Sequence, residues 1–88
     1  MMNLYTIKDC KSQSFQGMYP CPNDALAIRS FSSQNVKQQF PTIAEFPGDF
    51  QLFKVGEFDD VTGDLKPDLK HVADFTDLFE VSKDGKQS

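Results

Sequence analysis

The chain has 88 residues, a net charge of −4, 39% hydrophobic residues and nine phenylalanines. One domain accounts for this length, and a few aromatic side chains can fill a small core, so we expect a folded domain rather than a disordered chain. No stretch approaches the ~20 apolar residues that a membrane-spanning helix needs, and the N-terminus lacks the pattern of a signal peptide. We therefore expect a protein that stays in the cytoplasm where it is made, without membrane contact.

The charge is divided unevenly along the chain. Residues 1–44 carry four basic and two acidic side chains, a net +2, whereas residues 45–88 carry five lysines and eleven acids, a net −6. This balance argues against nonspecific coating of nucleic acid, because that binding depends on Lys and Arg. It leaves open a local basic face in the first half and a basic protein partner for the second.

The first half of the chain predicts a strand, a short strand and a helix. Residues 2–9 are rich in strand formers. The segment 10–22 has the apolar residues for a second strand around Phe15–Tyr19, which Pro20 should keep short. Residues 23–31 predict the main helix, because Asn23 can cap its first turn and its apolar residues fall on one face.

The second half predicts mainly extended structure. A Thr-x-x-Glu capping box at 42–45 indicates a short helix that Pro47 ends, and residues 50–58 are the best strand in the chain. Residues 59–64 have hairpin chemistry, followed by a return strand that Pro67 should interrupt. The apolar spacing in residues 68–81 fits an amphipathic helix, with an extended edge segment as the alternative.

Together these elements predict one α+β domain over residues 1–81, with one main helix packed on a small, mostly antiparallel sheet. Residues 82–88 are polar and read as a flexible C-terminal tail.

The inventory of reactive side chains argues against an enzyme. His71 is the only histidine, and the chain has neither a Gly-x-Ser-x-Gly elbow nor a glycine-rich phosphate loop. The acids at positions 57–64 lack the spacing of a calcium loop, and one histidine with two cysteines is too few for a structural zinc site. We expect no catalytic residue, no metal and no cofactor. Cys10 and Cys21 are expected to be free thiols, although a turn around Gly17 would bring them together.

Binding of a single strand of nucleic acid needs aromatic rings for stacking and cations along the path of the backbone. Tyr5, Phe53 and other aromatic residues lie on predicted strands, near lysines in the sequence. Strict alternation puts Lys54 on one face of the strand 50–58 with Phe50, Leu52 and Phe58, and points Phe53 the other way. One face is then a core and the other a stacking surface, unless both serve as core.

Three segments carry a family resemblance: Leu4–Asp9, Ala25–Phe31 and, above all, Asp49–Gly63. In order and spacing they resemble the small nonstructural protein of gokushoviruses, which are microviruses with circular single-stranded DNA genomes that infect bacteria. The resemblance covers roughly residues 3–63, and the segment 49–63 is its most specific part. It implies a viral protein that is made in the host cytoplasm and is absent from, or minor in, the virion. The family is regarded as DNA-binding, or as the counterpart of the small microvirus protein that shifts DNA replication toward single-strand synthesis and packaging.

The leading hypothesis is therefore a nonstructural phage protein that contacts single-stranded DNA during genome synthesis and packaging. Tyr5 and Phe53 are the candidates for base stacking, and Lys8, Arg29 and Lys54 are the candidates for phosphate contacts. The alternative is an adaptor that engages phage replication or procapsid proteins, or a host factor, through the acidic second half. Self-association through an exposed sheet edge, giving a homo-oligomer, is compatible with either role.

Overall fold

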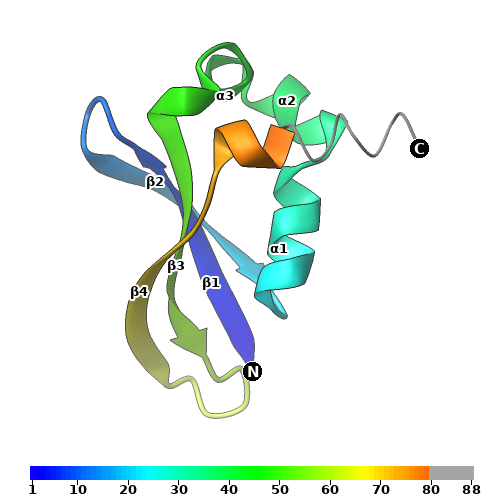
Figure 1. Ribbon diagram of the computed structural model, residues 1–88. Helices are drawn as coiled ribbons and strands as arrows, with labels where there is room; N and C mark the ends of the chain where they lie inside the picture. Colours follow the sequence, from blue (N-terminus) through cyan, green and yellow to red (C-terminus); the bar gives the residue numbers. More distant parts are fainter. Residues whose placement is uncertain (80–88) are drawn as a thin grey trace.

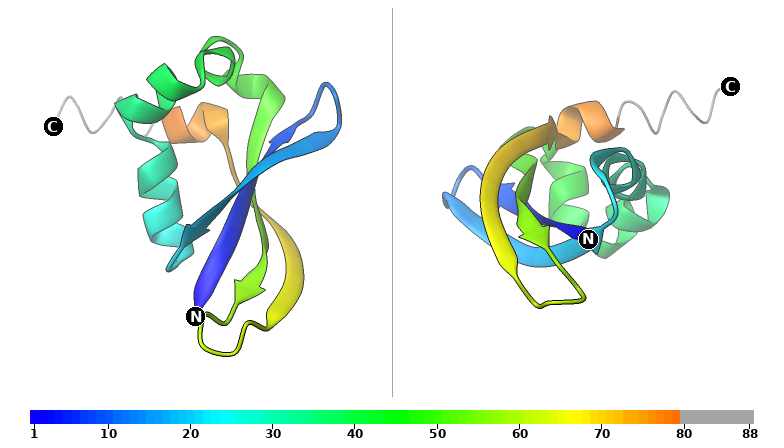
Figure 2. Two further views of the ribbon diagram at one scale, coloured as in Figure 1. Left: turned by 180° about the vertical axis from the view of Figure 1, so that it is seen from behind. Right: turned by 90° about the horizontal axis from the view of Figure 1, so that it is seen from below.

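A computed structural model describes residues 1–79, and the expected tail at residues 82–88 lies outside this range. A twisted four-stranded sheet has the order β2-β1-β3-β4, and every neighbouring pair is antiparallel. The strands are β1 (Met2–Asp9), β2 (Ser14–Cys21), β3 (Phe50–Phe58) and β4 (Leu65–Asp74). Helices cover one face of this sheet, while no helix within residues 1–79 lies on the opposite face (Figures 1 and 2). The structure thus has the expected α+β architecture with an antiparallel sheet.

The helical layer differs from the single main helix that the sequence predicted. The helix α1 (Asp24–Phe31) is the longest in the described part of the chain, and Asn23 caps it by accepting a hydrogen bond from the N–H of Leu26 at 2.9 Å. It is followed by α2 (Gln34–Gln39), α3 (Pro41–Glu45) and a 3-10 turn, η1 (Pro47–Asp49). Pro41 and Pro47 each begin a new short element, which divides the connection between α1 and β3 into several turns.

Both edge strands are longer than the sequence predicted. The strand β2 continues through Pro20, and β4 continues through Pro67. Each proline is tolerated because an edge strand has one side without a hydrogen-bonding neighbour. The segment expected to be either a helix or an extended edge is divided: β4 ends at Asp74, and residues 75–79 are helical.

The β1–β2 hairpin separates the two cysteines. Its turn lies at residues 10–13, so Cys10 follows the end of β1, whereas Cys21 pairs with Asn3 near the strand's beginning. Six or more strand steps, about 20 Å, separate the two positions, and a disulfide needs Cα atoms within about 7 Å. Both thiols are free, and the expectation that a turn around Gly17 brings them together is wrong.

A bulge in β3 changes which side chains share a face. Tyr5 pairs with Lys54, but Leu4 pairs with Gly56, so Val55 is an extra residue without a partner on β1. Beyond this bulge, Glu57 lies on the same face as Lys54, and its carboxylate reaches the Lys54 ammonium group at 3.3 Å. The prediction that Phe58 shares a face with Lys54 is therefore wrong, because it assumed unbroken alternation.

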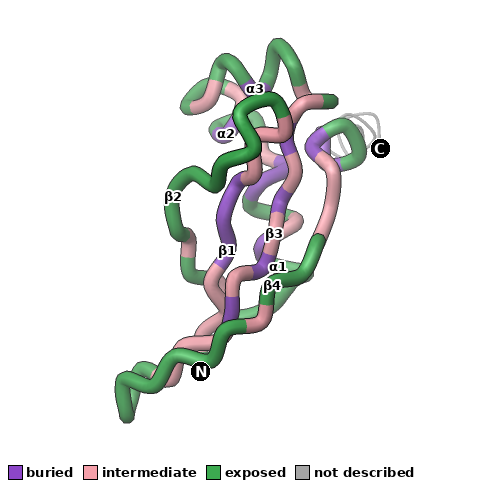
Figure 3. Tube along the Cα trace, turned by 90° about the vertical axis from the view of Figure 1, so that its left-hand side faces the viewer, coloured by how far each residue is buried: buried purple, intermediate pink, exposed green. Residues whose placement is uncertain are grey.

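The core lies between the sheet and the helices. On the sheet side, Tyr5, Ile7 and Leu52 are at most 1% exposed, and Figure 3 shows the buried stretches along the two central strands. On the helical side, Ala27, Phe31 and Phe75 close the same cluster. The inward faces of β1 and β3 are thus used for packing, and the other face of the sheet is left for contacts outside the chain.

Candidate nucleic-acid interface

The helix-free side of the sheet, here called the open face, carries a cluster of aromatic and basic side chains at one end. Lys8 on β1 pairs with Phe15 on β2, and Phe53 on β3 pairs with His71 on β4. Residues directly opposite one another in a sheet project from the same face. Four strands therefore contribute one side chain each to this cluster, which we call the aromatic-basic patch (Lys8, Phe15, Phe53 and His71).

The four side chains of the patch are in contact. The rings of Phe15 and Phe53 meet edge to face with centroids 5.7 Å apart, and Phe53 meets His71 in the same way at 5.5 Å. The ammonium nitrogen of Lys8 lies 5.9 Å from the centroid of Phe15 and 5.5 Å from that of Phe53. Phe15 is 48% exposed, so a flat ligand can reach its ring.

One carboxylate adjoins the patch and moderates its charge. Asp74 lies 2.8 Å from Nε2 of His71, and its same oxygen accepts a hydrogen bond from the side chain of Gln51 at 3.1 Å. These contacts fix the imidazole beside Phe53 and place one negative charge at the rim. Lys8 is therefore the permanent cation of the patch, which limits how many phosphates this surface can neutralise.

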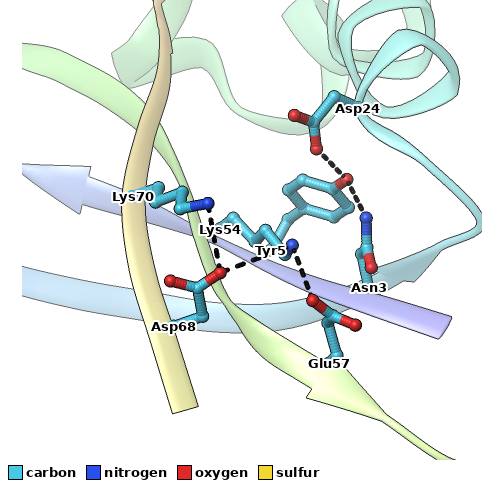
Figure 4. A network of polar contacts seen from close by, with 7 residues as sticks. All are labelled: Asn3, Tyr5, Asp24, Lys54, Glu57, Asp68 and Lys70. Carbon is cyan, nitrogen blue, oxygen red and sulfur yellow. Dashed lines mark hydrogen bonds and ion pairs between the residues drawn. The ribbon is translucent and has the colours of Figure 1, made fainter. Parts of the chain in front are cut away.

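Of the five residues predicted to contact DNA, the structure brings Lys8 and Phe53 together. Tyr5 lies on the opposite face of the sheet and is fully buried, so neither side of its ring is free to stack on a base. Its hydroxyl donates to Asp24 at 2.5 Å and accepts from the side-chain amide of Asn3 at 3.1 Å (Figure 4). Burial, followed by the hydrogen bond to Asp24, raises the pKa of Tyr5 to about 12.

Lys54 also lies on the helix-covered face, where it is held in an ionic network. Its ammonium group is 3.3 Å from Glu57 and 3.7 Å from Asp68, and Asp68 is in turn 3.3 Å from Lys70 (Figure 4). The side chain of Lys54 is only 11% exposed. A phosphate would have to compete with two carboxylates already in place, so this lysine is poorly suited to DNA contact.

Arg29 is exposed, but it belongs to α1 in the helical layer. That layer covers the face opposite the aromatic-basic patch (Figure 2). A strand lying across the patch would not pass Arg29 without wrapping around the edge of the sheet. The structure therefore separates Arg29 from Lys8 and Phe53.

Phe15 and His71 were not predicted as site residues. Phe15 belongs to a hairpin whose turn at residues 10–13 is not marked by glycine or proline; Gln13 adopts the positive φ there, at 55°. Had that turn been recognised, the register would have placed Phe15 opposite Lys8. The position of His71 depends on the bulges between β3 and β4, which have no sequence signal.

Other types of site are less well supported in residues 1–79. No group of three or more His, Cys, Asp or Glu side chains in this range is arranged to hold a metal ion. Two cavities of about 270 and 280 Å³ lie beside Phe40, between β2 and the helical layer. Both are smaller than the 300–1,000 Å³ typical of small-molecule sites. Among the described helices, none has the length and apolar character required to cross a membrane.

Comparison with known families identifies the chain. The model of the family described as "Phage ORF5 protein" matches residues 2–78, which include all four strands and α1. The chain belongs to the phage ORF5 family. It is therefore a phage protein, and the family match includes every residue of the aromatic-basic patch. Neither the curated proteins nor the solved structures give a significant match to the chain.

Proposed function

We propose that this phage ORF5 protein binds single-stranded DNA through the aromatic-basic patch during viral genome synthesis and packaging in the host cytoplasm. Its resemblance to the small nonstructural protein of gokushoviruses, which have single-stranded DNA genomes, supports this proposal. The observation that carries the proposal is the contact of Lys8 with two phenylalanine rings on the open face. Proteins that bind single-stranded nucleic acid use aromatic rings to stack on its bases and nearby cations to contact its phosphates.

The chemistry of the patch favours an unpaired strand over a duplex. Phe15 and Phe53 offer ring surface on which bases can stack. Only an unpaired strand exposes the faces of its bases for such stacking. The single lysine offers too little positive charge for binding dominated by the phosphates of a duplex. The patch would therefore bind one or two unpaired bases through stacking, with a phosphate held at Lys8.

Fluorescence anisotropy with a labelled single-stranded oligonucleotide tests the proposal. We expect saturable binding that Phe15→Ala weakens about 5- to 150-fold, since stacking of one base on an aromatic ring contributes about 1–3 kcal/mol. Phe15 is half exposed, so this substitution should leave the fold intact. The matched control is Leu26→Ala, which shortens an exposed apolar residue (43%) on α1 and should not change the affinity.

A second pair of variants tests the role of charge. Lys8→Ala should weaken binding and remove most of its salt dependence, whereas Arg29→Ala should leave both unchanged because Arg29 lies in the helical layer. For a single strand, one phosphate contact gives a slope of about −0.7, so a fourfold rise in salt lowers affinity about 2.6-fold. An equal loss in both variants would contradict the proposed location of the site. Absence of binding at low salt would favour the adaptor hypothesis instead.

A further inference from the structure

The end of the open face away from Lys8 is largely apolar. Met2 and Leu4 on β1 alternate with the inward-facing Tyr5, and the register places Phe58 opposite Met2 and Leu65 opposite Phe58. Leu69 projects from the same face of β4, two residues before His71. We call Met2, Leu4, Phe58, Leu65 and Leu69 the apolar half of the open face. Leu65 and Leu69 are 53% and 59% exposed.

This pattern is unusual for the water-facing side of an antiparallel sheet. Such a side normally carries polar residues that alternate with the apolar residues of the core. Contiguous apolar surface on a small protein generally marks a contact site. We propose that two copies of the chain pack with their open faces together, related by a two-fold axis.

The distribution of charge favours a second copy as the occupant. Beyond the apolar half lies the β3–β4 turn with Asp59, Asp60 and Asp64, and at the opposite end of the sheet lie Lys8 and Lys11. A two-fold axis that lies in the interface and runs perpendicular to the strands brings the acidic end of each copy to the basic end of the other. The same surface thus supplies both halves of the complementarity.

Carboxylates at the basic end offset part of its positive charge. Asp9 accepts hydrogen bonds from the backbone N–H groups of Lys11 and Ser12, and Asp74 is engaged by His71 and Gln51. Both keep their negative charge, so this end is close to neutral, whereas the turn with Asp59, Asp60 and Asp64 stays acidic although Asp60 pairs with the N-terminal amine at 3.8 Å. The charges therefore favour the arrangement that brings Lys8 and Lys11 of one copy to the acidic turn of the other and keeps the two acidic turns apart.

Association through the edges of the sheet, which the sequence suggested, is less favourable. Pro20 lies in β2 and Pro67 in β4, so each free edge lacks one backbone donor. Prolines and bulges on edge strands are common features that oppose pairing with another chain. In the described part of the chain, the open face is thus the better surface for self-association.

The size of the face determines how the two copies must overlap. Four strands about 4.8 Å apart, each with about eight residues of 3.3 Å, give a flat area of about 500 Å² per copy, or about 1,000 Å² for two. That total only matches the minimum of about 1,000 Å² expected of a biological interface, and the apolar half alone reaches about half of it. The whole open face must therefore be covered, including the aromatic-basic patch. A second copy and a DNA strand would then exclude one another.

Sedimentation equilibrium of the full chain without DNA tests the dimer. We expect the mass to rise with concentration from 9.9 kDa toward about 20 kDa. Leu69→Lys places a charge in the centre of the apolar half and should keep the mass at 9.9 kDa. Leu26→Lys, the same change at an exposed position on α1, should dimerise like the wild type. A wild type that stays monomeric at near-millimolar concentration, or a Leu69→Lys variant that still dimerises, would overturn the inference.

Adding a single-stranded oligonucleotide separates this inference from the proposed function, on which it does not rest. If DNA binds and the dimer dissociates, the shared face is supported. If DNA binds an intact dimer, the proposal that the whole open face is covered is refuted. If no DNA binds while the wild type dimerises and Leu69→Lys does not, the proposed function fails and the dimer stands.

Discussion

The hydroxyl group of Tyr5 should make a measurable contribution to stability, because it joins two distant parts of the fold. It links β1 to Asp24, the first residue of α1, through a 2.5 Å hydrogen bond. Tyr5 is fully buried, whereas Asp24 is exposed to water. Replacing it in Tyr5→Phe removes the donor to Asp24 and the acceptor for Asn3. Hydrogen bonds to charged groups contribute about 1.5–3 kcal/mol. Because water can reach Asp24 in the variant, we expect a loss of about 1–2 kcal/mol at neutral pH.

The same contact predicts a loss of stability at alkaline pH. Burial and the neighbouring carboxylate raise the pKa of Tyr5 from 10.0 to about 12 in the folded chain. Below pH 10 the phenol is neutral in both the folded and the unfolded chain, so its full contribution is present. Between pH 10 and 12 the unfolded chain ionises first, and the free energy of unfolding should fall. A shift of this size corresponds to about 3 kcal/mol.

Urea denaturation followed by circular dichroism measures both effects. The wild type and Tyr5→Phe should differ by about 1–2 kcal/mol at neutral pH, and the difference should shrink and then reverse as the pH rises from 10 to 12. The variant has no phenol at position 5, so its own pH dependence reports every other titrating group. Parallel loss of stability in the two proteins across this window would refute the reasoning.

Three further substitutions test other parts of the structure. Gly56→Ala should destabilise the fold by about 1–3 kcal/mol, because the added Cβ would lie 2.3 Å from the backbone oxygen of Lys66. Gly48→Ala is the control in thermal denaturation, because its Cβ would make only an ordinary 4.0 Å contact with the side chain of Thr76. Lys54→Met should be nearly neutral in urea denaturation and leave DNA affinity unchanged, since its two carboxylate partners can return to water. His71→Ala should weaken DNA binding, because the imidazole supports the ring of Phe53 at a centroid distance of 5.5 Å; an unchanged affinity by anisotropy would exclude His71 from the site.

The elements with strong local signals were predictable from the sequence. The strand-forming run at residues 2–9, the capped helix at 23–31 and the strand at 50–58 correspond to β1, α1 and β3. In each case the local preference and the final environment agree, since these elements provide the centre of the sheet and the first helix on it. The edge strands were harder to predict because each contains a proline, and proline is tolerated in a strand mainly where one side of that strand has no neighbouring strand. Only the assembled sheet determines which strands lie at its edges.

The candidate site was predictable only in part, because a central strand can bury either of its faces. Tyr5 and Phe53 look alike in the sequence, as aromatic residues on strands near lysines. Alternation predicts that Phe53 and its neighbour Leu52 project from different faces of the sheet, but it does not predict which face the helices cover. The bulge at Val55 then reverses the pattern toward the end of β3. Tyr5 and Lys54 consequently face inward, while Lys8 and Phe53 come together on the open face.

The architecture also determines which experiment can separate DNA binding from an adaptor role. Deleting residues 64–88 would remove the acidic segment, but also β4 and three side chains that are 0–8% exposed, Phe75, Leu78 and Phe79. At about 1.5–3 kcal/mol each, these three side chains alone approach the 5–15 kcal/mol that holds a domain together. We expect circular dichroism to show that the truncated chain is unfolded, so a loss of partner binding in this variant would carry no information.

Asp60→Asn and Asp64→Asn in the full chain change the acidic turn without touching the core. They should leave DNA affinity nearly unchanged if the aromatic-basic patch is the site, and a retained fold with lost partner capture would favour the adaptor.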